Sequence, residues 1–363
     1  MPYTAILLTF VVKQGGNMEL GISMFGDNRM DLATVKFRPA GERLTELLEE
    51  IKLMDEVGLD YFGIGEHHRP DYVVSSPEII LAAAATITKR IKLGSAVSVI
   101  SSADPVKLYQ NFATIDLLSG GRAELMAGRG SFIESFPLFG YSLQDYDALF
   151  TEKLDLLLAI NKNDRVTWNG KFRASLDDQQ VLPRAVNNDL SIWIAVGGTP
   201  QSVVRAGKLG LPLMIAIIGG SPAQFKPLFE LYKKTYLEHG HDPSQLRVGI
   251  HSHALFGDDD AMLSKEYYPL YAAQMDRVGR SRGWPPYQRT QFDFGKSKHG
   301  ALFIGEPEAM VEKILYMQEQ FGLTRFAAHM DMGAPSHKML MKSIEIYGTK
   351  IAPKIRTALG ENE

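Results

Sequence analysis

Short apolar segments alternate with stretches of helical period along most of this 363-residue chain. Eight segments have the length and character of buried strands, at residues 19–25, 60–65, 91–100, 122–128, 190–197, 212–218, 247–256 and 325–331. This even rhythm predicts a (β/α)8 TIM barrel. A doubly wound sheet could hold as many strands, but no Gly-x-Gly-x-x-Gly motif follows the first segment, which favours the barrel.

Two stretches interrupt the rhythm and predict insertions after the fourth and seventh helices. The first covers residues 162–189. The second covers residues 279–304 and is rich in Gly, Pro and aromatic residues. Long loops within a barrel are usually lids or contact surfaces. We therefore expect residues 279–302, which show no helical or strand period, to form a mobile lid or a partner-contacting loop.

Length and composition are those of an ordinary globular enzyme. Residues 18–363 are expected to form one barrel domain, since such barrels routinely exceed 250 residues. Residues 1–17 are expected to be a poorly ordered leader or a mis-assigned start, because Met18 follows a Gly-Gly-Asn turn and opens the first strand.

The absence of cysteine excludes disulfides, thiolate catalysis, iron–sulfur clusters and cysteine-ligated zinc. The net charge of -3 and the scattered basic residues give no reason to expect nucleic acid or membrane as a partner. The apolar run 5–12 is too short to span a bilayer and lacks signal-peptide features. We expect a cytoplasmic protein that forms a homo-oligomer, most simply a homodimer.

Two of the predicted strands end abruptly in polar chemistry. Segment 60–65 runs into Glu66-His67-His68, and segment 122–128 runs into Arg129. In α/β proteins ligands bind outside the carboxyl ends of the strands. His67, His68 and Arg129 are therefore predicted to belong to one site. The alternative is that the two histidines lie in a solvent-exposed loop.

The fifth strand is followed by the pattern of a phosphate site. Residues 196–200 read Val-Gly-Gly-Thr-Pro, so Gly198 allows close approach of a ligand and Thr199 is placed to cap the next helix. The free N–H groups at that helix start, with Ser202 one turn on, suit a phosphate monoester. Arg129, on the neighbouring strand, could contact the same phosphate. A capped helix after a glycine turn is the plainer alternative.

The ends of the third and sixth strands carry small and aliphatic side chains. Such residues can sandwich an isoalloxazine ring and pair with its edge through backbone groups. Taken singly, each would be ordinary barrel core. The candidates for this bed are Ala96, Val97, Ala216 and Ile217.

His251 and His253 share one face of the seventh strand. With His67, His68 and Asp331 they could form the metal cluster of a barrel hydrolase. That reading leaves the phosphate pattern unexplained, so we expect no metal. His251 or His253 is then expected to line the flavin or substrate pocket, or to be a core histidine with its hydrogen bonds satisfied. The residues expected to line the substrate pocket are Phe25, His68, Phe132, Glu134 and His251.

The ordered motifs resemble those of the bacterial luciferase-like flavin oxidoreductases over residues 19–350. Each motif is weak alone, but their order and spacing are specific. The motifs that carry the resemblance are Glu66-His67-His68, Ser95-Ala96-Val97-Ser98-Val99, Asp104-Pro105-Val106, Leu117-Leu118-Ser119-Gly120-Gly121-Arg122, Gly128-Arg129-Gly130 and Gly198-Thr199-Pro200-Gln201-Ser202.

The resemblance implies a barrel that binds FMN, often as reduced FMN delivered by a separate NAD(P)H-dependent flavin reductase. Members activate dioxygen or transfer a hydride. The residue matching His67 sits over the flavin near the carbon that reacts with oxygen, and a cis peptide would join Ala96 to Val97. The phosphate would be held by Arg129, Gly198, Thr199 and Ser202.

This chain departs from bacterial luciferase at Gly128, where luciferase has a reactive cysteine, so neither light emission nor an aldehyde substrate is expected. The leading hypothesis is an FMN-dependent monooxygenase acting on a small organic substrate, with His67 as general acid–base. One alternative is a deazaflavin-dependent reductase or dehydrogenase. Its longer tail would need more basic residues than Arg129 alone provides. A flavin-binding protein without turnover is a further alternative.

Overall fold

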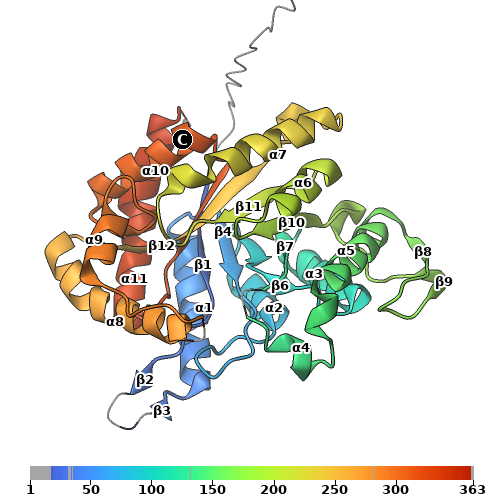
Figure 1. Cartoon of the computed structure of the whole chain (residues 1–363), viewed down its shortest axis with the longest axis horizontal. Helices are drawn as coiled ribbons and strands as arrows, with labels where there is room; N and C mark the ends of the chain where they lie inside the picture. The colour runs from blue at the N-terminus through green and yellow to red at the C-terminus, as the bar shows by residue number, and fades with distance from the viewer. Residues whose placement is uncertain (1–17, 32–33, 35, 131, 281, 361–363) are drawn as a thin grey trace, which may run out of the picture.

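Eight parallel strands form a closed barrel in the computed structural model, which describes residues 18–31, 34, 36–130, 132–280 and 282–360 (Figure 1). The predicted leader, residues 1–17, lies outside the described residues. Each strand pairs with its neighbour, and the pairing of the last strand with the first closes the ring. The barrel strands are β1 (Glu19–Met24), β4 (Tyr61–Ile64), β5 (Lys92–Ser95), β7 (Ala123–Gly128), β10 (Ser191–Val196), β11 (Leu213–Ala216), β12 (Val248–Phe256) and β14 (Arg325–His329).

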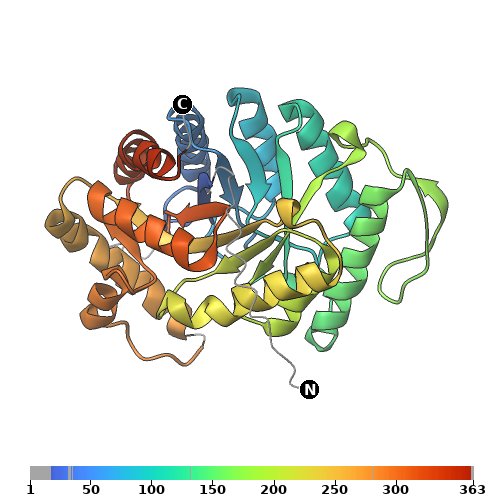
Figure 2. The ribbon, with the colours of Figure 1, turned by 90° about the horizontal axis from the view of Figure 1, so that it is seen from above.

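Helices surround the barrel, as the view in Figure 2 shows. Two of them, α8 and α10, lie between β12 and β14, whereas each of the other crossovers is built on one long helix. The surrounding helices are α1 (Ala40–Glu56), α2 (Pro77–Ile87), α3 (Pro105–Ser119), α5 (Tyr146–Lys162), α6 (Pro200–Leu209), α7 (Lys226–Glu238), α8 (Asp260–Arg280), α10 (Pro307–Phe321) and α11 (His337–Ile346). Shorter helices are α4 (Ser135–Leu138), α9 (Arg289–Lys296) and α12 (Ala352–Ala358).

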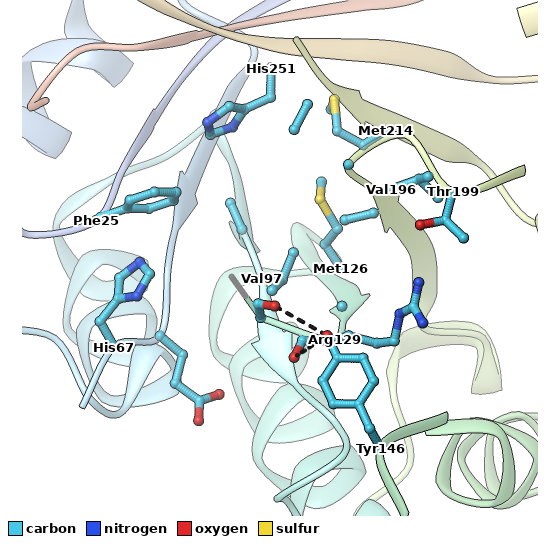
Figure 3. A pocket seen from close by; sticks show the side chains of 17 residues that line it. Phe25, His67, Val97, Met126, Arg129, Tyr146, Val196, Thr199, Met214 and His251 are labelled. Atoms are coloured by element: carbon cyan, nitrogen blue, oxygen red, sulfur yellow. Dashed lines mark hydrogen bonds between the residues drawn. The ribbon is translucent and has the colours of Figure 1, made fainter. Parts of the chain in front are cut away.

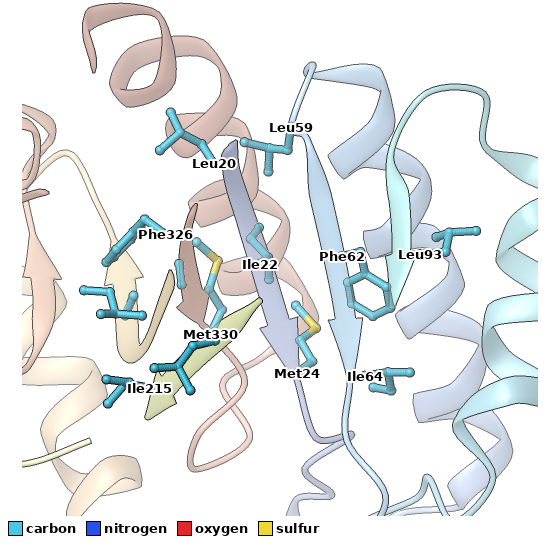
Figure 4. Close-up of a cluster of buried hydrophobic side chains, with 14 of the residues drawn as sticks. Leu20, Ile22, Met24, Leu59, Phe62, Ile64, Leu93, Ile215, Phe326 and Met330 are labelled. Atoms are coloured by element: carbon cyan, nitrogen blue, oxygen red, sulfur yellow. The ribbon is translucent and has the colours of Figure 1, made fainter. Parts of the chain in front are cut away.

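The strands alternate between two cores, as their period of two requires. Outward-facing residues such as Ile22, Phe62 and Leu93 pack against the helices (Figure 4). Inside the barrel, Tyr61 and Trp193 form a smaller cluster with three further buried residues. These apolar layers explain why each strand appears in the sequence as a nearly continuous hydrophobic run.

The TIM barrel prediction is confirmed, and every predicted strand is present with ends that differ by at most two residues, apart from one interruption. The predicted strand 91–100 is divided into β5 and the short β6 (Ser98–Val99). The division falls at the peptide bond between Ala96 and Val97, which is cis, as the family resemblance implied. Among the described residues, no helix has the length and apolar character needed to cross a membrane.

Both predicted insertions are present. The first holds the antiparallel hairpin of β8 (Arg165–Trp168) and β9 (Leu176–Gln180), which stands away from the barrel in Figure 1. The second lies on the opposite side and contains α9 and β13 (Phe303–Gly305), which pairs with β12.

The expectation that residues 279–302 form an aperiodic loop is wrong in its second half. A capping box between Gln288 and Gln291 starts α9, and Phe292 is fully buried. The buried ammonium of Lys313 donates to the carbonyl oxygens of Gly295, Lys296 and Leu302, at 3.1, 3.3 and 2.7 Å. These hydrogen bonds attach the main chain of the insertion to the Lys313 side chain of α10.

Candidate active site

A cavity of about 330 Å³ opens at the carboxyl ends of the barrel strands. Its lining comes from the residues that follow β1, β4, β5, β7 and β10, together with inward-facing strand residues such as Met126 and Met214. Figure 3 shows Phe25 and His67 along one side, with Arg129 and Thr199 opposite them. This is the position at which TIM barrels hold their ligands.

His67 is 7% exposed and is packed among aromatic rings. Its ring centroid lies 4.3 Å from that of Tyr72 and 4.5 Å from that of Phe25. Burial, reinforced by the Arg69 guanidinium, lowers the pKa of His67 to about 3, so the imidazole is neutral at physiological pH. Its Nε2 atom has no hydrogen-bond partner among the described residues. A neutral ring with one unpaired nitrogen therefore faces the cavity.

The opposite end offers donors suited to an anion. Arg129 donates to Ser202 Oγ at 3.0 Å and to Asp147 at 2.5 Å, so the predicted proximity of β7 and β10 is confirmed. The Thr199 hydroxyl does not cap α6, which corrects the sequence interpretation. Thr199 instead lines the cavity, and its hydroxyl makes no capping hydrogen bond to the start of α6.

The backbone beside Thr199 lies next to open space. A Cβ atom built at Gly197 would meet nothing within 4 Å, and one at Gly198 would meet only Phe225, at 4.0 Å. Gly198 has a φ of 129°, which favours glycine. Gly197 lines the cavity and Gly198 follows it, so the turn leaves room for a ligand near Arg129.

The predicted apolar bed is present in part. Ala96, Val97 and Ala216 line the cavity. Ile217 is fully buried, and its backbone N–H donates to the His251 carbonyl, which places it behind the cavity wall. Gly128 is required by packing, because a Cβ there would lie 2.5 Å from Val97 Cγ2.

The residues predicted for the substrate pocket separate into two groups. Phe25 and His251 line the cavity just described, and Phe25 also lines a second cavity together with Phe132. His68 and Glu134 line neither of these two cavities. The His68 ring is hydrogen-bonded to Glu66 at 2.9 Å, and Glu134 accepts from Arg69 at 2.9 Å.

The histidines considered for a metal cluster have other partners. A hydrogen bond of 3.0 Å joins His251 Nδ1 to Ser23 Oγ, and one of 2.8 Å joins His253 Nδ1 to the Tyr271 hydroxyl. Asp331 accepts the backbone N–H groups of residues 25, 26 and 27. Within the residues that the structure describes, the ligand set of this alternative interpretation is not among the groups whose ligand atoms lie close together; Asp331 instead lies with Asp27 and His329.

Several lining residues were not singled out from the sequence. Glu66 accepts the Val99 N–H at 2.8 Å and thereby ties the loop after β4 to the bed. Its place in the Glu-His-His motif was the available signal. Tyr146, whose ring lies 5.3 Å from the Arg129 guanidinium, is the first residue of α5 and belongs to no motif. Met126 and Met214 looked like ordinary core.

Fold and site together define a barrel enzyme whose cavity suits a flat ligand with an anionic end. The family model described as luciferase-like monooxygenase matches residues 18–325. The chain therefore belongs to the luciferase-like monooxygenase family, and it is a flavin-dependent oxidoreductase enzyme of that family.

Individual relatives are distant but cover most of the chain. Limonene 1,2-monooxygenase of Rhodococcus erythropolis is 25% identical over 321 residues, which is 86% of this chain and 82% of that protein. The oxygenating constituent of 3,6-diketocamphane monooxygenase from Pseudomonas putida, solved with FMN, has a TM-score of 0.73 at 20% identity and covers 93% and 99% of the two chains. An F420-dependent secondary alcohol dehydrogenase has a TM-score of 0.72 at 17% identity and covers 94% and 99%. The two solved structures support the fold.

Proposed function

We propose that this protein is an FMN-dependent monooxygenase that uses reduced FMN and dioxygen to oxidise a small organic substrate. The observation that supports it best is the polarity of the first cavity. An unpaired neutral imidazole lies on one side, at His67, and an arginine paired with a serine lies on the other, at Arg129 and Ser202.

The residues present fit FMN. Its phosphate would lie by Arg129, Ser202 and Thr199, where the Gly197 turn leaves space. Its ring would rest on the apolar bed at Val97, facing His67. When bound, FMN supplies the redox chemistry of the reaction. The bed is uncharged, which suits an aromatic ring system.

The chain's own residues then have distinct tasks. His67 Nε2 can hold or move a proton at the ring side of the cavity, because a neutral imidazole can either donate or accept. Phe25 and Tyr72 pack around it and exclude water from that side. Glu66 orients the adjoining loop.

FMN is favoured over a deazaflavin by the charge of the lining. In the part of the chain that the structure describes, Arg129 is the one arginine or lysine side chain on the wall of this cavity. A longer and more highly charged tail would be expected to meet additional cations. The fold relatives include an FMN complex and an F420-dependent enzyme, so fold alone does not discriminate.

The proposal includes a separate NAD(P)H-dependent flavin reductase. The FMN phosphate would occupy the one anion-binding end of the cavity, so we propose that NAD(P)H reduces FMN on another protein and that reduced FMN then binds here. It also includes a homodimer in the cytoplasm, with residues 18–363 folding as one domain.

Ligand titration tests the proposal. FMN, anaerobically reduced FMN and F420 are titrated into the wild type, Arg129→Ala and the matched control Arg165→Ala, with flavin fluorescence as readout. Arg165 is exposed and, like Arg129, is paired with an aspartate. Loss of one charge-assisted contact should weaken FMN binding about tenfold to a hundredfold in Arg129→Ala alone.

Substrate-dependent product formation with NADH, FMN and a flavin reductase tests turnover in the same samples, because free reduced FMN consumes oxygen without any monooxygenase. Tighter binding of F420 than of either FMN form would contradict the cofactor assignment. Equal FMN affinity in Arg129→Ala and Arg165→Ala would remove Arg129 from the phosphate site.

A further inference from the structure

A second cavity of about 500 Å³ adjoins the first, and the Phe25 ring is part of the wall of both. Residues of the second insertion, from Arg282 to Leu302, form much of its lining, and the rest comes from α8, from His253 on β12 and from the loops after β1, β4, β7, β11 and β14. Phe25 also packs against His67. A molecule in this second cavity would therefore lie next to the imidazole side of the first.

The wall of the second cavity is aromatic and, among the residues that the structure describes, includes no acidic residue. Seven of its residues are Phe, Tyr or Trp, including Trp284, Tyr287 and Phe294 of the insertion, and none is Asp, Glu or Lys. The one formal charge is that of Arg282, whose guanidinium lies 5.1 Å from the Trp284 ring and 5.8 Å from the Phe132 ring. Aromatic faces stack on flat apolar rings, and the burial of apolar ligand surface against them favours binding.

Apart from Arg282, the polar groups on this wall are neutral hydrogen-bonding groups. His253 is 4% exposed, and burial lowers its pKa to about 3. Its ring is bonded to the Tyr271 hydroxyl at 2.8 Å, and the Tyr72 hydroxyl accepts from Gln274 at 3.3 Å. An ionised carboxylate in this setting would lose its hydration, and Arg282 is the one formally charged side chain of the described lining that could pair with it.

We propose, on the basis of the proposed function, that the second cavity holds the substrate and that the substrate is an uncharged, ring-containing apolar molecule. The volume suits a ligand of drug-like size. Polyanions are disfavoured by the lack of lysines on the wall, and straight-chain aldehydes gain little from stacking surfaces. The insertion is accordingly the specificity-determining segment, and its aromatic side chains form the roof of the site.

The test measures binding of a neutral fluorophore, N-phenyl-1-naphthylamine, to the full-length protein with and without bound FMN. Competitors are a neutral bicyclic ketone, n-decanal, n-decanoate and EDTA. We expect the bicyclic ketone to displace the probe at concentrations at least about tenfold below those needed for the other three. Displacement by decanoate or EDTA at equal or lower concentration would overturn the proposal.

Two variants locate the probe. Phe294→Asp places a charge on the roof at a residue that is 55% exposed, and Leu237→Asp is the matched control on α7, at 46% exposure. Probe affinity should fall at least about fivefold in Phe294→Asp and stay unchanged in Leu237→Asp. Trp284→Ala, which adds no charge, should also weaken binding.

Size-exclusion chromatography of the same variants separates a substrate site from a contact between two copies of the chain. If Phe294→Asp changes the oligomeric state while probe affinity is unchanged, the aromatic surface is an interface and the proposal fails. FMN titration in each sample separates the two hypotheses. Normal FMN binding without selective probe binding overturns this inference alone, whereas selective probe binding without FMN binding supports it and contradicts the proposed cofactor.

Discussion

The two ends of the barrel treat buried charge in opposite ways. At the amino ends of the strands, the fully buried Arg325 donates to both carboxylate oxygens of Glu124, at 2.6 and 3.0 Å, and to Glu19 at 2.7 Å. Its guanidinium lies between the rings of Tyr61 and Trp193, each 4.1 Å away. Two carboxylates and two aromatic rings of the chain thus hold this buried cation.

At the carboxyl ends, several buried polar atoms have no partner among the described residues: His67 Nε2, both ring nitrogens of His329, and Asp27 Oδ1. Burial raises the pKa of Asp27, and Asp331 beside it raises the pKa further. Unpaired buried polar groups cost stability. The closed end therefore stabilises the barrel, whereas the open end carries buried polar atoms without hydrogen-bond partners at a cost in stability, and of the residues that carry them His67 lines the first cavity.

The largest expected effect comes from breaking the closed end. Arg325→Met leaves Glu124 buried without its main partner, so the free energy of unfolding should fall by roughly 3–5 kcal/mol. Chemical denaturation followed by circular dichroism measures it. Adding Glu124→Gln removes the unpaired charge and should restore part of the loss. A fall below about 1 kcal/mol in Arg325→Met would mean that the closed end is not the stabilising one.

An intermediate effect is expected from the pH dependence of the open end. His329 is fully buried, and burial holds its pKa well below the usual value, even though Asp331 is 3.6 Å away. The unfolded chain takes up a proton near pH 6.5 and the folded chain does not, so stability falls as the pH drops below that value. Between pH 7 and pH 5 this group should account for a loss of about 2 kcal/mol.

Urea unfolding of the wild type and of His329→Gln at the two pH values isolates that contribution. Any effect of the substitution on the free energy of unfolding that is the same at both pH values cancels, because the readout is the difference between pH 7 and pH 5. The difference should be about 2 kcal/mol smaller in the variant. Equal differences in the two proteins would show that His329 is protonated in the folded state.

The smallest effect on stability, with a large effect on turnover, is expected at His67. Gln keeps a polar group of similar size, and His67 Nε2 has no hydrogen-bond partner to lose in the described part of the chain. His67→Gln should therefore change the free energy of unfolding by less than about 1 kcal/mol. Substrate-dependent oxygen uptake should fall by about a hundredfold. Unchanged uptake at unchanged FMN affinity would make His67 a packing residue.

The sequence predicted the parts of this molecule that local pattern determines. Each strand is a short apolar run, and parallel neighbours bring Arg129 to Ser202 without any knowledge of the loops. The pairing of Arg325 with Glu124 escaped prediction because it joins residues 201 positions apart, and Arg325 simply opens a strand. The expected cap at Thr199 failed because a hydroxyl at a helix start can also face a cavity.

The second insertion shows the same limit from another side. Its helix α9 is only 8 residues long, too short for a periodic pattern to be recognised. Phe294 and Trp284 carry no motif, so nothing in their spacing indicated that they meet Phe25 and Phe132 around one cavity. The second cavity could be found only by folding the chain.

The attachment of the second insertion through Lys313 has a consequence for how this enzyme could change its specificity. The ammonium binds carbonyl oxygens of residues 295, 296 and 302, and every amino acid supplies such an oxygen. These hydrogen bonds therefore involve no side chain of the segment, although Gly295 itself is restricted, because a Cβ there would lie 2.7 Å from Leu302 Cδ1. Mutations could therefore exchange the aromatic residues of the roof one by one while the hydrogen bonds from Lys313 keep the segment in place. A laboratory selection for new substrates could begin with these residues.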